Sequence, residues 1–220
     1  MGRSSSDIIL ASASPRRQEL MRRLGFEFAV EVAAVDEQAY RGGSPEEATA
    51  RVAAAKGVAL RRPGRVVVAA DTAVVTDGEV LGKPGSSAEA TDMLRRLRGQ
   101  RHRVLTAIAV VAAGRTAVDV VSTLVQMRPY GEEEIAAYVA SGEPFDKAGA
   151  YAIQDRRFRP VERIRGCYQN VIGLPLCHLC RRLQAAGVTL PGVPPPLCRV
   201  DLGRECPVAM YNPTEPVWIP

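Results

Sequence analysis

Residues whose side chains could bind a phosphate chain lie at four separate places in this 220-residue sequence. The first place is the stretch SASPRR, which follows a short apolar run. A strand that leads through a serine-containing loop into a helix presents unpaired backbone N–H groups at the positive end of the helix dipole. Hydroxyl and guanidinium donors beside those groups would suit a polyphosphate, whereas the alternative is an ordinary capped helix with surface arginines. The candidate residues are Ser12, Ser14, Arg16 and Arg17.

A single acidic residue interrupts a long apolar run of the sequence. Asp71 lies within residues 66–75, which otherwise resemble an inner strand. Burying an ionised carboxylate without a partner is costly, so we expect Asp71 to emerge at a strand end or to lie beside a cation. There it could hold Mg²⁺ or orient a water molecule, and the alternative is a strand-end cap. Glu37 and Asp36, which follow another expected strand, could supply a second carboxylate.

Lysine is rare in this chain. Of its 29 basic residues only three are lysines, namely Lys56, Lys83 and Lys147. A lysine that serves as a compact, rotatable point charge is not replaced well by the flat guanidinium of arginine. We therefore expect these lysines to contact a ligand, since cations that converge on Asp71 would neutralise a triphosphate and its leaving pyrophosphate. Gln154, which has both a donor and an acceptor, could read the edge of a base.

The elements that must position these residues mix strands and helices. Ser14, Pro15 and Gly25 are typical of the N-cap, the first turn and the end of a helix, and the Asp77-Gly78 pair predicts a hairpin. Because hairpins occur beside crossover helices, the sequence predicts an α/β fold with a mixed sheet. Strands are expected at 8–11, at 26–35, twice within 65–82, at 103–112, at 116–127 and within 161–176, with helices at 15–24, 44–61, 87–97, 131–140 and 175–186.

Composition limits the class of protein. With 46% hydrophobic residues, the chain can form one globular domain or two small lobes. A net charge of +5 and 5% aromatic residues argue against a nucleic-acid groove. The longest apolar run, residues 104–113, is half the length that a bilayer requires, and no apolar signal core begins the chain. We therefore expect a cytoplasmic protein without a membrane partner.

The C-terminal part differs in composition and carries two of the five cysteines. From residue 191 the chain is rich in proline and lacks any helical or strand period, so we divide it into a domain, 1–190, and a proline-rich arm, 191–220. A structural zinc site could join the arm to the last helix. A disulfide in the arm and simple packing of cysteine as a small apolar residue are the alternatives. The four thiolates concerned are Cys177, Cys180, Cys198 and Cys206.

Taken together, four motifs resemble the Maf family of nucleoside triphosphate pyrophosphatases. They are LASASPRRQEL, AADTAVVTDGEVLGKP, DKAGAYAIQ and GCYQNVIGLPL, and they occur in the order and spacing of that family. Each is weak alone, but the four in order are specific. They extend from residue 8 to about residue 187 and therefore cover nearly the whole domain.

The resemblance implies an elongated two-lobe α/β fold, related to inosine triphosphate pyrophosphatases, with a cleft between the lobes. It also implies hydrolysis of a nucleotide to the monophosphate and pyrophosphate with a divalent cation, Mg²⁺ or Mn²⁺, and it suggests a homodimer. Asp71 matches the general base of the family. Arg16, Thr72 and Gln154 match positions associated with substrate choice, and Ser12, Arg17, Glu37, Lys56, Lys83 and Lys147 match polar positions of the cleft.

The DKAGAYAIQ segment resembles the branch of the family that acts on dTTP and UTP. Two residues depart from the pattern: Asp155 replaces a usual glycine, which adds a charge and stiffens a bend beside Gln154, and Cys167 replaces a usual serine or threonine. The predicted reaction is attack on the α-phosphorus by a water molecule that Asp71 activates. The alternatives are hydrolysis of modified nucleotides and a non-catalytic regulator of cell division that binds nucleotide or nucleic acid.

Overall fold

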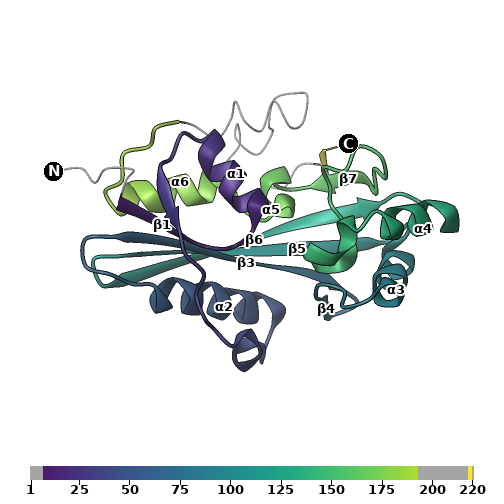
Figure 1. Cartoon of the computed structure of the whole chain (residues 1–220), viewed down its shortest axis with the longest axis horizontal. Coiled ribbons are helices and arrows are strands. Elements are labelled where there is room, and N and C mark those ends of the chain that lie inside the picture. The colour runs from purple at the N-terminus through teal and green to yellow at the C-terminus, as the bar shows by residue number, and fades with distance from the viewer. Residues whose placement is uncertain (1–6, 193–217, 220) are drawn as a thin grey trace.

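The computed structural model describes residues 7–192 and 218–219, which form a mixed α/β fold built on one twisted sheet (Figure 1). The strand order is β2-β1-β3-β5-β6-β7-β8, and β4 pairs with the end of β3. The first strand is parallel to both of its neighbours, and all other pairs are antiparallel. The strands are β1 (Ile8–Ala11), β2 (Phe28–Val30), β3 (Val66–Thr76), β4 (Glu79–Leu81), β5 (Arg101–Ala112), β6 (Arg115–Met127), β7 (Val161–Arg165) and β8 (Trp218–Ile219).

Helices cover both faces of this sheet. In Figure 1, α1, α5 and α6 lie on one face, α2 lies on the other, and α3 and α4 lie at the far end. Short 3-10 helices at Glu37–Tyr40, Glu143–Asp146 and Ala148–Ala150 occur in the connections. The α-helices are α1 (Pro15–Arg23), α2 (Pro45–Ala59), α3 (Ser87–Leu97), α4 (Glu132–Ala140), α5 (Tyr168–Ile172) and α6 (Leu176–Ala185).

Local sequence signals explain several of these boundaries. Ser44 and Glu47 form a reciprocal capping box that begins α2, with Pro45 in its first turn. Asp77 and Gly78 both have positive φ angles, 50° and 78°, and this turn joins β3 to β4 as the sequence predicts. Most expected helices and strands are therefore present within one or two residues of their predicted ends.

Two expectations differ from the structure. Residues 26–35 are expected to form a strand, but β2 has three residues, since its partner β1 is only four residues long and pairs with β2 through three of them. A strand is expected within 161–176, and β7 takes residues 161–165 of that stretch, but residues 168–172 form the short helix α5, which ends at Gly173 with φ 117°. Of the expected C-terminal arm, residues 193–217 lie outside the described part of the chain, and β8 pairs with β7.

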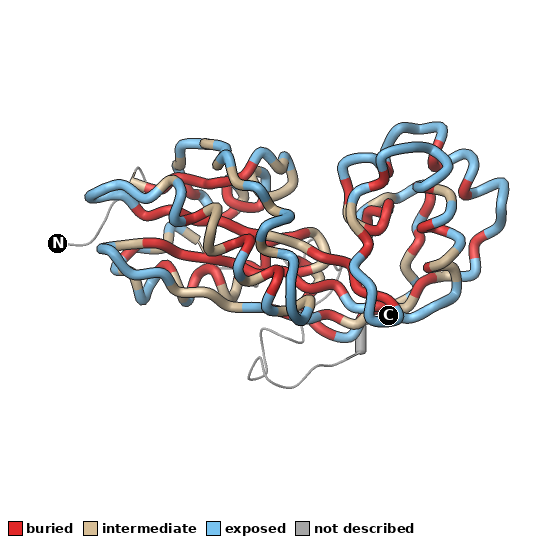
Figure 2. Tube along the Cα trace, turned by 90° about the horizontal axis from the view of Figure 1, so that it is seen from below, coloured by how far each residue is buried: buried red, intermediate tan, exposed pale blue. Residues whose placement is uncertain are grey.

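Separate hydrophobic clusters divide the elongated molecule into two lobes (Figure 2). The larger lobe contains β1, α1, α2 and α6, and its apolar side chains pack on both faces of the sheet. The smaller lobe contains β4, α3 and α4, which pack around Leu94, Tyr130 and Phe158. Strands β3, β5 and β6 are long enough to extend through both lobes, so the sheet sets the position of one lobe relative to the other.

An ion pair fastens α6 to the sheet in the larger lobe. Arg182 on α6 donates from Nε to Asp119 Oδ2 of β6 at 2.8 Å, and its second nitrogen contacts Oδ1 of the same carboxylate. This hydrogen bonding lowers the pKa of the Asp119 carboxyl below its usual range. A lowered pKa contributes stability above the pKa of the unfolded state, about 3.9 for Asp, and that contribution is lost as the pH falls through the folded value.

We therefore expect Asp119→Asn to lower the melting temperature relative to the unchanged protein at about pH 7, and we expect the difference to shrink as the pH falls below about 4. Thermal unfolding followed by circular dichroism over this pH range measures the difference. Asp92→Asn, at an exposed i,i+3 pair on α3, is the matched control and should change little at any pH. A difference of the same size at acid and neutral pH would contradict the assignment to this carboxyl.

Candidate active site

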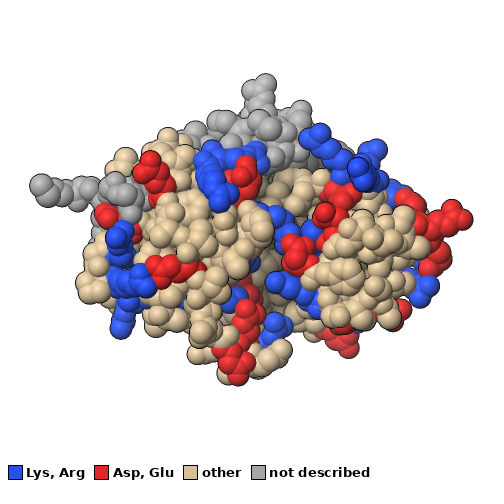
Figure 3. Space-filling view, in the orientation of Figure 1, with Lys and Arg blue, Asp and Glu red and all other residues tan. Residues whose placement is uncertain are grey.

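A pocket of about 920 Å³ lies between the two lobes. In Figure 3, basic and acidic side chains meet in the middle of the face shown, between the two halves of the molecule. Of the candidate residues within the described ranges, all except Asp36, Cys177 and Cys180 line this pocket: Ser12, Ser14, Arg16, Arg17, Glu37, Lys56, Asp71, Thr72, Lys83, Lys147 and Gln154. Residues from five separate segments (12–17, 37, 56, 71–83 and 147–154) therefore share one cavity, and all three lysines of the chain are among them.

A break in the edge of the sheet explains how the pocket forms. The β1 register with β3 ends at Ala69, and β4 begins to pair with β3 at Val74. Between these points no described strand pairs with that edge of β3. Successive residues of a strand point to opposite faces, so Asp71 and Thr72 are directed to different sides of the sheet. Because the edge is open there, both side chains reach the same pocket.

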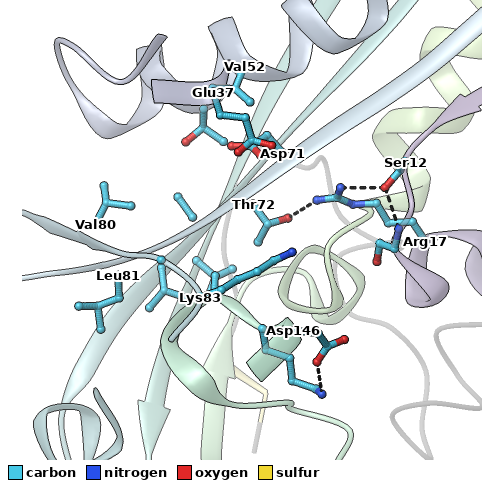
Figure 4. Close-up of a pocket in the computed structure, with 18 of the residues that line it drawn as sticks. Ser12, Arg17, Glu37, Val52, Asp71, Thr72, Val80, Leu81, Lys83 and Asp146 are labelled. Atoms are coloured by element: carbon cyan, nitrogen blue, oxygen red, sulfur yellow. Dashed lines mark hydrogen bonds and ion pairs between the residues drawn. The ribbon is translucent and has the colours of Figure 1, made fainter. Parts of the chain in front are cut away.

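On the α2 side of the sheet, one lysine joins two carboxylates. Lys56 Nζ lies 3.0 Å from Asp71 Oδ1 and 2.7 Å from Glu37 Oε1 (Figure 4 shows the carboxylates side by side). Partial burial would raise the pKa of Glu37, but the hydrogen bond and the charge of Lys56 hold the pKa below its usual range. Asp71 thus lies beside a cation, as expected for a carboxylate within an apolar strand, although it lies in the middle of β3 and not at its end.

The two carboxylates are oxygen ligands of the kind that a divalent cation binds. Glu37 and Asp71 converge on one point, where the Lys56 ammonium supplies the positive charge. Mg²⁺ commonly takes one or two protein carboxylates and completes its shell with water and substrate phosphates. Within residues 7–192 and 218–219, no group of three or more His, Cys, Asp or Glu side chains could hold a metal by itself. A cation at this place would therefore depend on ligands from the substrate.

On the opposite side of the sheet, Arg17 donates hydrogen bonds to residues from three separate segments that surround the pocket. Its Nε donates to Gly173 O at 2.9 Å. One terminal nitrogen donates to Ala70 O at 2.9 Å and to Ser12 Oγ at 3.2 Å, and the other donates to Thr72 Oγ1 at 2.9 Å (Figure 4). Burial lowers the pKa of Arg17, and the Asp71 charge opposes that effect. Arginine nevertheless stays protonated, so its charge faces the pocket at any working pH.

The start of α1 is another source of donors. Ser14 occupies the N-cap position, as its sequence context predicts, but its side chain makes no capping hydrogen bond. The Ser14 N–H instead donates to Ser12 Oγ at 3.3 Å. The Ser14 hydroxyl and the first N–H groups of the helix therefore remain available at the pocket wall, where a helix N-terminus favours anions.

The two lysines of the smaller lobe differ in their surroundings. Lys83 is exposed, points toward the middle of the pocket (Figure 4), and makes no hydrogen bond or ion pair with any residue in the described part of the chain. Lys147 is 7% exposed, and its ammonium donates to the backbone oxygen of Glu143, to Glu143 Oε2 at 3.0 Å and to Asp146 Oδ1 at 2.6 Å. All three donors of Lys147 are thus used within its own loop.

Asp146 is a pocket residue that the sequence analysis did not select. Its other oxygen, Oδ2, accepts from Arg16 at 2.7 Å, so one carboxylate joins Arg16 of the larger lobe to Lys147 of the smaller one. Burial would raise the pKa of Asp146, but the hydrogen bond from Lys147 and the charge of Arg16 lower it. An acidic residue directly before a rare lysine was the signal that could have found it.

A tight loop presents Gln154 to the pocket. Gly149 has φ 69°, and a Cβ there would lie 3.0–3.2 Å from the Val74 side chain, so only glycine allows this approach. Gln154 itself is exposed at the pocket. Asp155 follows Gln154 directly, and its Oδ1 accepts from the backbone N–H groups of Arg157 and Phe158 at 2.9 and 2.7 Å. The carboxylate is therefore directed into the following turn.

The three cysteines within the described residues, Cys167, Cys177 and Cys180, are not among the residues that line this pocket. Cys180 is buried with Leu179 and Leu183 on the apolar side of α6, consistent with simple packing. Cys177 is on the same helix, whereas Cys198 and Cys206 lie outside the described residues, so the zinc site stays a prediction. Within the described residues, no helix is both long enough and apolar enough to cross a membrane.

Comparisons with known proteins agree with the motifs. Residues 7–186 match a family described as Maf-like protein. The dTTP/UTP pyrophosphatase of Thermomicrobium roseum is 51% identical over 209 residues, 92% of this chain and 94% of the relative. That of Symbiobacterium thermophilum is 49% identical over 182 residues, 82% of this chain and 94% of the relative. The solved Ham1 protein of Staphylococcus aureus gives a TM-score of 0.41 at 19% identity, over 56% of this chain and 74% of that one.

Proposed function

The chain belongs to the Maf-like protein family, and we propose that it hydrolyses dTTP and UTP to the monophosphate and pyrophosphate. Relatives with this named activity align with 82% or more of the chain. The observation that carries the proposal is the shared pocket, which Asp71 lines together with Lys56, Lys83, Lys147, Arg16 and Arg17. A cavity of this charge and size suits a triphosphate held beside one carboxylate.

In the proposed reaction, Asp71 accepts a proton from a water molecule whose oxygen attacks the α-phosphorus. The bond between the α-phosphorus and the bridging oxygen breaks, and pyrophosphate leaves with that oxygen and the electron pair. Lys83, which has no ion pair with a described residue, and Arg17 stabilise the negative charge that grows on the leaving group. The α1 N-terminus, with Ser12 and Ser14, binds further phosphate oxygens.

Glu37 and Asp71 would hold the divalent cation, Mg²⁺ or Mn²⁺, that such a reaction uses. When bound, the cation supplies neutralising charge to the phosphate oxygens. Lys56 holds the two carboxylates together and keeps them from repelling each other. A divalent cation that arrives with the triphosphate would replace the Lys56 ammonium between these carboxylates or bind their remaining oxygens.

Base choice is assigned to Arg16, Thr72 and Gln154. Gln154 is exposed at the pocket and has both a donor and an acceptor, which suits the edge of a pyrimidine. Arg16 already donates to Asp146, so its remaining N–H groups face a restricted part of the pocket. Thr72 accepts from Arg17 and lies near the centre of the pocket wall.

A nucleotide panel tests the proposed function. With Mg²⁺ or Mn²⁺ present, we expect pyrophosphate release from dTTP and UTP, much less from the other common triphosphates, and none after the metal is removed with EDTA. Pyrophosphate is measured by a coupled assay, and the monophosphate is identified by chromatography. Tight nucleotide binding without hydrolysis would favour a non-catalytic regulator, and faster cleavage of modified pyrimidine nucleotides would make those the preferred substrates.

A further inference from the structure

A chain of buried hydrogen bonds leads from the pocket wall into the middle of the sheet. Arg17 donates to Thr72 Oγ1 at 2.9 Å, and the hydroxyl groups of Thr72 and Thr106 are 3.0 Å apart. Thr106, on β5, donates to the backbone oxygen of Asn170 on α5 at 2.9 Å. Thr106 is fully buried and is not among the residues that line the pocket. A nucleotide in the pocket would therefore meet Thr72 and Arg17 but not Thr106.

Which hydroxyl group donates in each of these hydrogen bonds follows from the single proton that each threonine carries. A hydroxyl group has one proton to donate. Thr106 gives its proton to Asn170 O, a carbonyl oxygen that can only accept, so the bond between the two threonines is donated by Thr72. Thr72 has then used its only proton, and its oxygen faces the N–H of Arg17 as an acceptor. Toward the pocket as well, Thr72 can only accept.

We propose that Thr106 is a positioning residue for phosphate binding, because its hydroxyl orients Thr72 and thereby holds the Arg17 guanidinium against the pocket. Without the Thr106 hydroxyl, the hydroxyl proton of Thr72 has no buried acceptor. It then points toward Arg17 or into the pocket, and toward Arg17 it meets the guanidinium N–H that Thr72 Oγ1 now accepts. The inference rests on the proposed function, since it places the phosphate chain next to Arg17.

The other end of the same network supplies a matched control. Thr123 on β6 is also fully buried and also contacts Asn170, whose Nδ2 donates to Thr123 Oγ1 at 2.9 Å. Thr123 donates to the backbone oxygen of Cys167 at 3.1 Å and accepts from its N–H at 3.0 Å. It therefore makes three hydrogen bonds, one more than Thr106, but none of them is to Thr72 or Arg17. Loss of its hydroxyl should disturb the core without changing the pocket wall.

The experiment compares Thr106→Val, Thr106→Ser and Thr123→Val in the full chain. For each, kcat and KM are measured with dTTP, the inhibition constant of pyrophosphate is determined, and the melting temperature is recorded. For Thr106→Val we expect KM and the inhibition constant each to rise about tenfold, the value of one well-oriented hydrogen bond to a charged group. Because Arg17 also stabilises the charge that grows on the leaving group, kcat should fall as well, by up to about tenfold.

Thr106→Ser keeps the hydroxyl and should restore both constants to within about twofold. Thr123→Val should lower the melting temperature at least as much as Thr106→Val while it leaves KM and the inhibition constant unchanged. Equal kinetic changes in the two valine variants, no change in Thr106→Val, or no rescue by serine would overturn the proposal. If the unchanged protein binds pyrophosphate but does not cleave dTTP, the proposed function fails, whereas the pyrophosphate constants still test the role of Thr106.

Discussion

Asp71→Asn is expected to lower kcat for dTTP by about a thousandfold, within the range found for loss of a general base. The amide keeps the size and shape of the carboxyl group and still offers an oxygen to Lys56, so the contact that now measures 3.0 Å can remain. What it loses is the ability to accept a proton from water and the charge that helps to hold a cation. The fold should therefore remain intact while turnover nearly disappears.

Steady-state kinetics with dTTP, together with circular dichroism and a thermal melt, measures this effect. Asp77→Asn is the matched control, since Asp77 lies on the same hairpin but outside the pocket lining, and asparagine tolerates its φ of 50°. The control should retain full activity. A kcat of Asp71→Asn within about tenfold of the unchanged protein would remove Asp71 from the role of general base.

Arg17→Lys is expected to reduce both stability and activity. The guanidinium donates in four directions, to Gly173 O, Ser12 Oγ, Ala70 O and Thr72 Oγ1. A lysine ammonium is a point charge and cannot reach these acceptors together. Loss of two or more hydrogen bonds from a charged, partly buried group should cost about 3 kcal/mol in the free energy of unfolding. Misplacement of the charge should lower kcat/KM for dTTP by about a hundredfold.

Denaturant unfolding and steady-state kinetics measure the two effects. Arg22→Lys is the control, because Arg22 lies on the same helix, is exposed, and makes one side-chain hydrogen bond, to Gln18. It should change the free energy of unfolding by less than about 0.5 kcal/mol. If Arg17→Lys changed the free energy of unfolding no more than Arg22→Lys does, the four hydrogen bonds of Arg17 would not contribute to the stability of the fold.

Much of the site could be predicted before the structure, because its residues are unusual for their local context. Asp71 stands out because an ionised group in an apolar strand needs a partner, and the lysines stand out because arginine supplies most of the positive charge. Hairpin and helix boundaries followed from turn and capping residues, whose effects are local. The extent of β2 did not, since a strand can pair only as far as its neighbour extends.

The sequence by itself determined which segments carry the chemistry, the α/β class and the family, because these depend on residue type, order and short-range periodicity. Tertiary structure alone decided which charges are already paired. Lys83 and Lys147 are the same residue type in neighbouring motifs, yet Lys147 uses all its donors on Glu143 and Asp146, whereas Lys83 has no such partner among the described residues. Asp146 in turn pairs with Arg16, 130 positions away. Such pairing depends on the distance between side chains in space, which residue spacing along the chain does not contain.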